Sequence, residues 1–322
     1  VIEQSICKFK IFDKMRWKME KKRVLITGAS GFIGQFVLKE IVKHEDIDFF
    51  AIDTRKISDV SVEKQESVSL LDKEKLMGII KKYQPNVIIH LAAIALVTHD
   101  NVGEIYNVNV QGTENLLEAA QEYCDNRTRV ILASTAGVYG NQEVEKYRED
   151  LPYNPANNYS YSKMITEYLG KRYKDNLEIV TIRPFNIIGV GQSENFLIPK
   201  LVEHFANKKE KLSVGNISSF RDYVDVEYCA EVILELIQRE KIEFDVLNIC
   251  SGIPTSGEMI LQLLQEMTSF KPEIEISKNF VRKNEVWRMI GDTTRLSKFM
   301  NGKKSQSVKD ILLKMLDYYK NK

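Results

Sequence analysis

The chain has 322 residues, 43% of them hydrophobic, and so can bury the core of one large or two small domains. Its 46 basic and 45 acidic residues leave a formal charge of +1, which argues against a general nucleic-acid-binding or membrane-binding surface. No apolar run approaches the roughly 18 residues of a membrane span. The four cysteines and four histidines lack the spacing of a disulfide framework or a metal site, so we expect no metal and a cytoplasmic location.

The N-terminal segment differs in character from the rest of the chain. Residues 1–18 have alternating charge and no apolar region of signal-peptide type, so we expect them to be a disordered extension or a wrongly assigned start, with a short amphipathic helix as the alternative. From Met19, short apolar segments alternate with segments of helical spacing, the latter including 73–83 and 102–124. The predicted strands are RVLITG, FFAID, ESVSLL, NVIIHLAA and RVILAS. This alternation predicts an α/β fold with a Rossmann-type doubly wound parallel sheet, covered by helices on both faces.

The pattern changes after residue 184. Short strand candidates (LSVG, RDYVDV and VLNIC) then alternate with helical segments near 225–239, 255–268 and 306–320. We therefore expect an NAD(P)-binding domain over 19–184 and a smaller α/β substrate lobe over 185–322. The lobe would close a cleft over the carboxyl ends of the sheet strands, and some of its chain would cross back to the main sheet.

A glycine-rich loop comes after the first predicted strand. The segment VLITGASGFIG places Gly28, Gly31 and Gly34 three residues apart, between a strand and a helix. The first glycine permits a tight turn, the second lets the backbone approach a pyrophosphate, and the third lets the helix pack on the sheet. The helix N-terminus favours the phosphate charge. We therefore predict a dinucleotide site that also includes Ser30, Phe32 and Ile33.

An acidic residue ends the second predicted strand, at the distance expected of such a site. Asp53 can accept hydrogen bonds from both hydroxyls of a ribose, which favours NAD(H) over NADP(H). A turn-capping aspartate is the simpler alternative. Arg55 and Lys56 come shortly afterwards and could hold a 2′-phosphate, so NADP(H) stays as the second cofactor. Asp72 is a candidate for the adenine edge, and the small-residue floor under the ring is predicted at Leu91, Ala92 and Ala93.

Three further residues carry the predicted chemistry. In NNYSYSKMITE, Tyr159 and Lys163 stand four residues apart on a predicted helix and therefore share one face. A nearby ammonium favours the phenolate, so we expect Lys163 to lower the pKa of Tyr159 towards neutrality. Thr135, at the end of a predicted strand in ILASTAGVYG, could polarise a carbonyl beside Tyr159. Alone, each has an ordinary structural alternative: a solvated helix face, or a threonine bonded to its own backbone.

These motifs together carry a family resemblance. TGASGFIG, HLAA, NVNVQGTENLLEAA, ASTAGVYG, YSYSK, RPFNIIG and RDYVDV occur in the order typical of the extended short-chain dehydrogenases/reductases, over roughly residues 22 to 320. The chain is most similar to their sugar-nucleotide epimerase, dehydratase and reductase branch. The resemblance implies that Thr135, Tyr159 and Lys163 do the chemistry. It also implies homodimers through helices 102–124 and 157–175, and further cofactor contacts at Leu71, Asn109 and Pro184.

The second half of the chain carries the predicted substrate contacts. Asn186, Arg221 and Arg282 fall where related enzymes hold a nucleotide diphosphate, and Glu285 falls where they hold a ribose. The planar guanidinium of arginine suits phosphate oxygens, and two such groups can neutralise a diphosphate. Either arginine could instead form an ordinary surface ion pair. The nucleotide base is not readable from the sequence.

Three reactions of this branch compete. Related 4,6-dehydratases carry acidic residues directly after the catalytic threonine, where this chain has Ala136 and Gly137, so dehydration is disfavoured. Thr135, Tyr159 and Lys163 would serve a 4-epimerase and a 4-reductase equally. A GQ-x-x-x-F segment ending at Phe196 resembles reductases of 4-keto-6-deoxy nucleotide sugars, which we therefore favour. A non-catalytic NAD-binding sensor is the alternative from another class.

Overall fold

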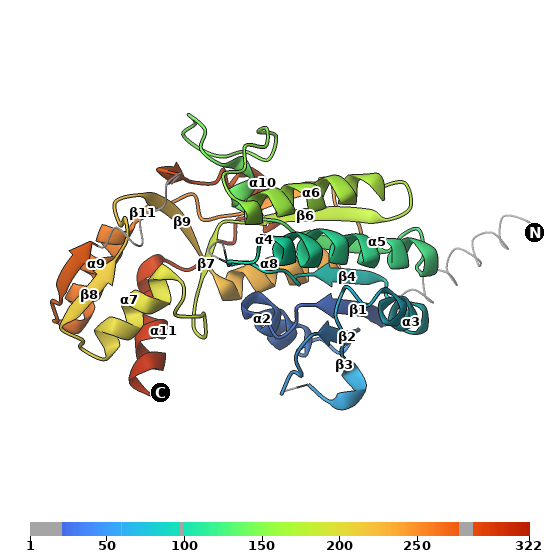
Figure 1. The fold of residues 1–322 in the computed structure, drawn as a ribbon, viewed down its shortest axis with the longest axis horizontal. Helices are drawn as coiled ribbons and strands as arrows, with labels where there is room; N and C mark the ends of the chain where they lie inside the picture. Colours follow the sequence, from blue (N-terminus) through green and yellow to red (C-terminus); the bar gives the residue numbers. More distant parts are fainter. Residues whose placement is uncertain (1–20, 59, 97–98, 277–285) are drawn as a thin grey trace, which may run out of the picture.

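A seven-stranded parallel sheet forms the centre of the molecule (Figure 1). The computed structural model describes residues 21–58, 60–96, 99–276 and 286–322. Every neighbouring pair of strands in the main sheet is parallel. The strand order is β10 (Val246–Ile249), β6 (Glu178–Pro184), β5 (Arg129–Ala133), β4 (Val87–His90), β1 (Lys22–Thr27), β2 (Ile47–Asp53) and β3 (Gln65–Ser67). The predicted Rossmann-type sheet is thus confirmed.

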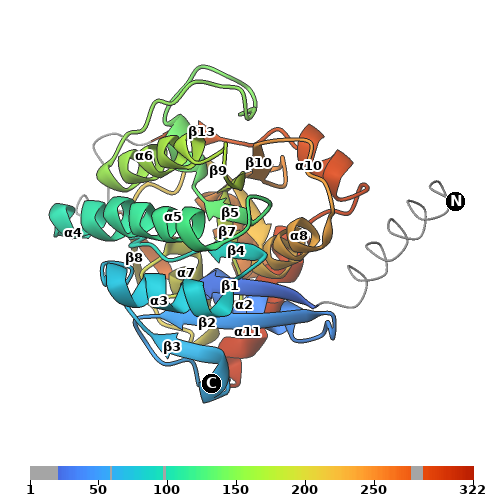
Figure 2. The same cartoon turned by 90° about the vertical axis from the view of Figure 1, so that its right-hand side faces the viewer.

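Helices cover both faces of this sheet (Figure 2). One face carries α3 (Lys73–Tyr83), α5 (Gly112–Tyr123) and α6 (Asn158–Arg172), and the other carries α2 (Phe32–Ile41) and α8 (Val226–Gln238). Because successive strand residues point to opposite faces, Leu25 joins the core under α3 and α5. Its neighbours Val24 and Ile26 join the core under α2 and α8. Such near-continuous apolar runs are typical of strands buried on both faces.

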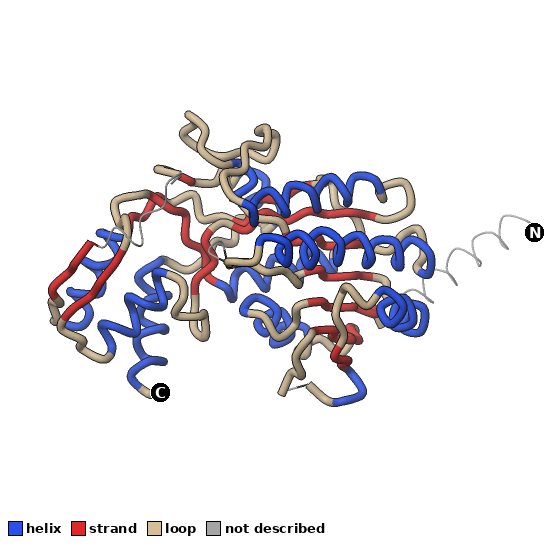
Figure 3. The backbone as a smooth tube through the Cα atoms, viewed as in Figure 1, coloured by secondary structure: helices blue, strands red, loops and turns tan. Residues whose placement is uncertain are grey.

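A smaller lobe lies at one end of the main sheet (Figure 3). The chain enters it directly from β6 through β7 (Asn186–Ile188), which pairs with β9. Leu201, Phe205, Leu264 and Met315 are buried in its core. The lobe is built from α7 (Leu197–Ala206), β8 (Lys211–Val214), β9 (Phe220–Asp225), β11 (Pro254–Ser256), α9 (Gly257–Thr268), β12 (Glu273–Ile276), β13 (Arg288–Met289) and α11 (Val308–Lys320).

Part of the C-terminal half returns to the main sheet. Helix α8 packs against α2, and β10 pairs with β6 as the edge strand. The predicted strand VLNIC therefore belongs to the main sheet, where its residues are buried, rather than to the smaller lobe. The short elements η1 (Val62–Lys64), η3 (Ala136–Tyr139) and α10 (Thr294–Phe299) complete the fold.

The helix predicted over 102–124 is present and contains a π-helical turn. The chain forms α4 (Val102–Tyr106), a π-helical turn η2 (Asn107–Gln111) and then α5. Single π-helical turns inside α-helices are frequent at functional sites. This one carries Asn109, whose side chain reaches α6.

Candidate functional site

The glycine-rich loop has the geometry of a close backbone approach. Gly28 adopts φ +71°, which side chains rarely permit, and a Cβ atom there would lie 2.5 Å from the Ala92 nitrogen. A Cβ on Gly34 would meet the Gly28 carbonyl. Gly31 is the N-cap residue of α2. The first N–H groups of α2, which have no partner within the helix, therefore lie next to the loop. These residues fit the pyrophosphate of a dinucleotide.

Asp53 stands at the end of β2 and holds the loop. Its Oδ2 accepts a hydrogen bond from Ser30 N at 2.9 Å, and its Oδ1 accepts one from Arg55 N at 3.2 Å. The Arg55 guanidinium turns back and donates to Ser30 Oγ at 3.1 Å. The predicted ribose acceptor and the predicted phosphate donor therefore lie beside the same serine.

The remaining predicted cofactor residues follow or end strands of the main sheet, or begin α2. Leu91, Ala92 and Ala93 come after β4, and Ala92 N donates to Thr27 Oγ1 at 3.2 Å. Pro184 ends β6. The others are Phe32 and Ile33, partly buried against the core beneath α2, and Leu71, exposed beside Asp72. The Asp72 side chain caps α3 by accepting from Lys75 N, a role that the sequence analysis did not assign, so its contact with adenine stays a prediction.

Asn109 connects the π-helical turn to the catalytic helix. Its Nδ2 donates to Ser162 Oγ at 2.9 Å and to Ile94 O at 3.1 Å, while its Oδ1 accepts from Ile94 N at 2.8 Å. Ser162 in turn donates to the Tyr159 carbonyl at 2.7 Å. The buried amide of Asn109 thus fixes α6, and its predicted cofactor contact stays a prediction.

The predicted catalytic residues come together at the carboxyl end of β5. The Thr135 hydroxyl lies close enough to Tyr159 to lower the pKa of its phenol. Thr135 also accepts from Gly137 N at 3.1 Å, which caps η3. Lys163, one turn after Tyr159 on α6, is buried and donates to the Ala133 carbonyl at 2.8 Å.

The electrostatics of this group differ from our expectation. Burial raises the pKa of Tyr159 to about 12, and the Thr135 hydroxyl opposes that rise. Burial lowers the pKa of Lys163 to about 8, and the nearby Glu167 carboxylate opposes that fall. The expected lowering of the Tyr159 pKa by Lys163 is therefore wrong for this structure, because desolvation dominates and the ammonium is turned to the Ala133 carbonyl.

The predicted substrate residues are only partly placed. Asn186 begins β7 with an exposed side chain, and β7 lies beside β9, which carries Arg221. Arg221 donates to the Phe220 carbonyl at 2.9 Å. Arg282 and Glu285 lie outside the described residues. The structure thus brings Asn186 and Arg221 to neighbouring strands at the entrance of the smaller lobe.

Two buried polar residues near the site were missed by the sequence analysis. Asp222, next to Arg221, accepts hydrogen bonds from Ser251 N at 2.7 Å, Gly252 N at 2.8 Å and Gly291 N at 3.0 Å. His90 ends β4 and contacts Thr27 Oγ1 through Nδ1 at 2.7 Å. The histidine of HLAA and the aspartate of RDYVDV were both visible as polar residues within apolar strands, which was the available signal.

The positions after Thr135 offer no acid. The Ala136 side chain is buried, and a Cβ on Gly137 would lie 2.5 Å from Ser160 Oγ on α6. A glutamate or aspartate at Gly137 would require Ser160 to move. The packing around Ala136 and Gly137 thus leaves little room for an acidic side chain at these two positions.

The described part of the chain contains neither a metal cluster nor a membrane-spanning helix. No group of three or more histidine, cysteine, aspartate or glutamate side chains among residues 21–58, 60–96, 99–276 and 286–322 is arranged to hold a metal ion. Within the same ranges, no helix has the length and apolarity needed to cross a membrane.

Comparison with known proteins identifies the family. A model of the GDP-mannose 4,6 dehydratase family matches residues 25–315, nearly the whole of the fold. The chain belongs to this family. The family lies within the NAD-dependent epimerase/dehydratase branch of the extended short-chain dehydrogenases/reductases, as the sequence motifs predicted, and the chain is accordingly an enzyme of nucleotide-sugar metabolism.

Two relatives illustrate the reactions found among similar sequences. GDP-6-deoxy-D-talose 4-dehydrogenase of Aggregatibacter actinomycetemcomitans is 35% identical over 301 residues, which is 93% of this chain and 98% of the relative. GDP-6-deoxy-D-mannose reductase of Pseudomonas aeruginosa is 26% identical over 94% of this chain and 98% of the relative. Both names describe oxidation or reduction of a 6-deoxy sugar carried on GDP.

Solved structures show the same fold with bound cofactors. RMD from Pseudomonas aeruginosa complexed with NADPH has a TM-score of 0.80 at 25% identity, over 94% of this chain and 99% of that one. UDP-glucose 4-epimerase from Thermotoga maritima with UDP-glucose has a TM-score of 0.81 at 25% identity, over 93% and 99%. The NADPH named for RMD agrees with NADP(H), the second cofactor of the prediction.

Proposed function

We propose that the enzyme reduces the C4 carbonyl of a 4-keto-6-deoxy hexose carried on GDP, using exchangeable NADH or NADPH, and that it also runs the reverse oxidation. The observation that carries the proposal is the grouping of Thr135, Tyr159 and Lys163 without an acid at Ala136 or Gly137. This set suffices for hydride chemistry and lacks the extra acid–base pair that a dehydration would use. The names of the two relatives supply the 6-deoxy sugar and the guanosine carrier.

The residues suggest how the reaction proceeds. The nicotinamide dinucleotide, when bound, supplies the hydride that reaches C4. The neighbouring hydroxyls of Thr135 and Tyr159 would both turn to the C4 oxygen. Tyr159 gives its proton to that oxygen as negative charge develops there. The Lys163 ammonium, which here donates to the Ala133 carbonyl, would turn to stabilise the remaining phenolate and to hold the nicotinamide ribose.

Binding is assigned to the smaller lobe. We assign the diphosphate to Arg221, Arg282 and Asn186 and a substrate ribose to Glu285, because guanidinium groups bind phosphate oxygens in a bidentate way. Anchoring the remote nucleotide would orient C4 towards Tyr159 and so reduce the entropic barrier. Asn186 and Arg221 lie on the paired strands β7 and β9, which supports a shared role.

The remaining assignments concern the whole protein. We propose a cytoplasmic homodimer that pairs through α4, α5 and α6. Large side chains on these helices are exposed, namely Val102, Tyr161 and Tyr168, which supports a contact there. The similarity to a UDP-glucose 4-epimerase keeps 4-epimerisation as the second candidate.

A direct assay separates the two candidates. Purified enzyme is incubated with GDP-4-keto-6-deoxy-mannose and NADH or NADPH while the absorbance of the reduced cofactor is followed. We expect stoichiometric consumption of the cofactor and a 4-hydroxy product. UDP-glucose and GDP-mannose serve as controls and should give no change. Interconversion of UDP-glucose and UDP-galactose without net cofactor consumption would replace the reductase with the epimerase.

A further inference from the structure

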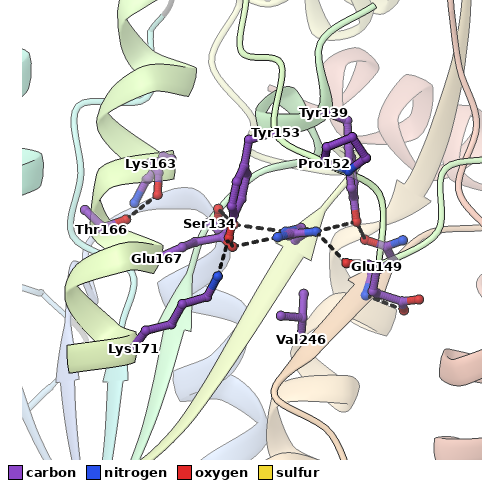
Figure 4. A network of polar contacts seen from close by, with 12 residues as sticks. Ser134, Tyr139, Glu149, Pro152, Tyr153, Lys163, Thr166, Glu167, Lys171 and Val246 are labelled. Atoms are coloured by element: carbon purple, nitrogen blue, oxygen red, sulfur yellow. Dashed lines mark hydrogen bonds and ion pairs between the residues drawn. The ribbon is translucent and has the colours of Figure 1, made fainter. Parts of the chain in front are cut away.

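A buried ion pair includes Glu167, which Figure 4 shows on the same helix as Lys163 and beside Ser134 and Tyr153. Glu167 on α6 and Arg183 on β6 form two hydrogen bonds, Arg183 Nε to Oε1 at 3.0 Å and Arg183 Nη2 to Oε2 at 2.7 Å. The side chains are only 1% and 3% exposed. A pair so fully withdrawn from water carries a large desolvation cost, which good geometry and further hydrogen bonds must offset.

Those further hydrogen bonds are present. Ser134 Oγ donates to Oε1 of Glu167, and Tyr153 OH donates to Oε2 at 2.8 Å. The remaining arm of Arg183 donates to Tyr139 OH at 2.8 Å and to the Glu149 carbonyl at 3.1 Å. Each carboxylate oxygen of Glu167 thus accepts two hydrogen bonds, which satisfies the acceptors of this buried side chain.

The network joins the three segments that carry the site. Ser134 is directly before Thr135, and Arg183 is directly before Pro184, where β6 turns towards the smaller lobe. Glu167 is one helical turn after Lys163, on the same face of α6. A rotation of α6 or a slip of either strand would break hydrogen bonds of the buried pair, so the relative positions of the segments are coupled.

Glu167 also acts on Lys163 through its charge. Desolvation lowers the pKa of Lys163, and Glu167 is the charged group that opposes it. The other titratable groups around Lys163 are Tyr159 on its own helix and His90 on β4. Burial and the positive charge of Lys163 lower the pKa of His90 to about 3, so His90 is neutral and supplies no counter-charge. From β5, the Ala133 carbonyl accepts a hydrogen bond from Lys163.

We propose that Glu167, held by Arg183, is a positioning residue: it fixes Ser134–Thr135 and the end of β6 against α6, and it keeps Lys163 charged for binding the cofactor. The inference rests on the proposed contact between Lys163 and the nicotinamide ribose. It concerns cofactor binding and orientation, and it requires no knowledge of the sugar.

The test is the pH dependence of the NADH dissociation constant, followed by cofactor fluorescence in Glu167→Gln. In the wild type we expect binding to weaken as Lys163 loses its proton, near pH 8. Glutamine removes the negative charge, so the lysine should deprotonate earlier and the loss of affinity should begin about one pH unit lower. Tyr153→Phe is the matched control, because it removes one hydrogen bond to the same carboxylate and keeps the charge. Its pH profile should coincide with that of the wild type.

A second variant controls for the possibility that Glu167→Gln alone does not fold. Glu167→Gln combined with Arg183→Met removes the guanidinium that glutamine would leave without a counter-charge, and its profile should show the same displacement. An unmoved profile in both variants, with affinity lowered equally at every pH, would reduce Glu167 to a purely structural role and overturn the proposal. NADH titration needs no sugar. The binding result can therefore be interpreted even if the enzyme does not reduce the proposed sugar at C4.

Discussion

We propose that the choice between NAD and NADP depends on single residues beside Ser30. The Asp53 carboxylate accepts hydrogen bonds from two backbone N–H groups and is the proposed acceptor of ribose hydroxyls, while the Arg55 guanidinium donates to Ser30 and is the proposed partner of a 2′-phosphate. A 2′-phosphate would face the repulsion of Asp53 and the attraction of Arg55. The balance between these two charges therefore sets the preference.

We expect Asp53→Asn to weaken NADH binding about tenfold or more, since hydrogen bonds to charged groups are worth about 1.5–3 kcal/mol. The same change should strengthen NADPH binding, because the repulsion of the phosphate is removed. Isothermal titration with each cofactor measures both effects. Arg55→Ala is the matched control and should weaken NADPH alone. Equal changes for both cofactors in Asp53→Asn would show that the aspartate only holds the loop.

At the scale of elements, Asp222 joins β9 to two loops of the smaller lobe. It is fully buried and accepts four hydrogen bonds, from the backbone N–H groups of Ser251, Gly252 and Gly291 and from the Ser251 hydroxyl at 2.6 Å. These bonds tie the strand that carries Arg221 to the loop after β10 and to the loop after β13. The geometry of the substrate side therefore depends on this carboxylate.

We expect Asp222→Asn to destabilise the fold by roughly 3 kcal/mol, because an amide nitrogen would face buried N–H donors. Urea unfolding measures the change. Asp225→Asn is the comparison, since its Oδ1 caps α8 at 3.0 Å from Glu227 N while its Oδ2 has no hydrogen-bond partner among the described residues. That variant should cost about 1 kcal/mol or less. Similar losses in both would mean that the hydrogen bonds of Asp222 are not the cause.

The elements also show what the sequence can and cannot predict. Apolar strands alternating with helices predicted the parallel sheet, and local spacing placed Tyr159 and Lys163 on one helix face. The π-helical turn at Asn109 was not predicted. Some chain was expected to return to the main sheet, but the returning strand β10 was assigned to the smaller lobe, because its partner β6 lies far along the chain. The Glu167–Arg183 pair was missed for the same reason: its 16-residue separation carries no periodic signal.

Folding of the whole molecule keeps one histidine, His90, in its neutral form. His90 is buried between Thr27 and Thr113, and burial lowers its pKa from 6.5 to about 3. In the unfolded chain it takes up a proton below about pH 6.5, whereas in the folded chain it does not. The unfolded state thus binds more protons between these two values, and the folded state loses stability as the pH falls.

We expect this one group to reduce the free energy of unfolding by about 1.4 kcal/mol per pH unit below pH 6.5, or roughly 2 kcal/mol at pH 5. Chemical unfolding at pH 7 and pH 5 measures the difference. It should shrink in His90→Gln and persist in His99→Gln, whose ring is partly exposed beside Glu104. If the free energy of unfolding of His90→Gln falls with pH as it does in the wild type, the loss of stability at low pH is due to other groups.

The measurement that tests the proposed chemistry most directly is the fate of the transferred hydrogen. The enzyme is given GDP-4-keto-6-deoxy-mannose and NADH deuterated at its transferable position, and the product is examined by NMR. We predict one deuterium, bonded to C4, in each product molecule. Tyr159→Phe should slow its appearance by about 10²–10³-fold. Deuterium at another carbon, or a product formed without deuterium while the NADH is retained, would contradict reduction at C4.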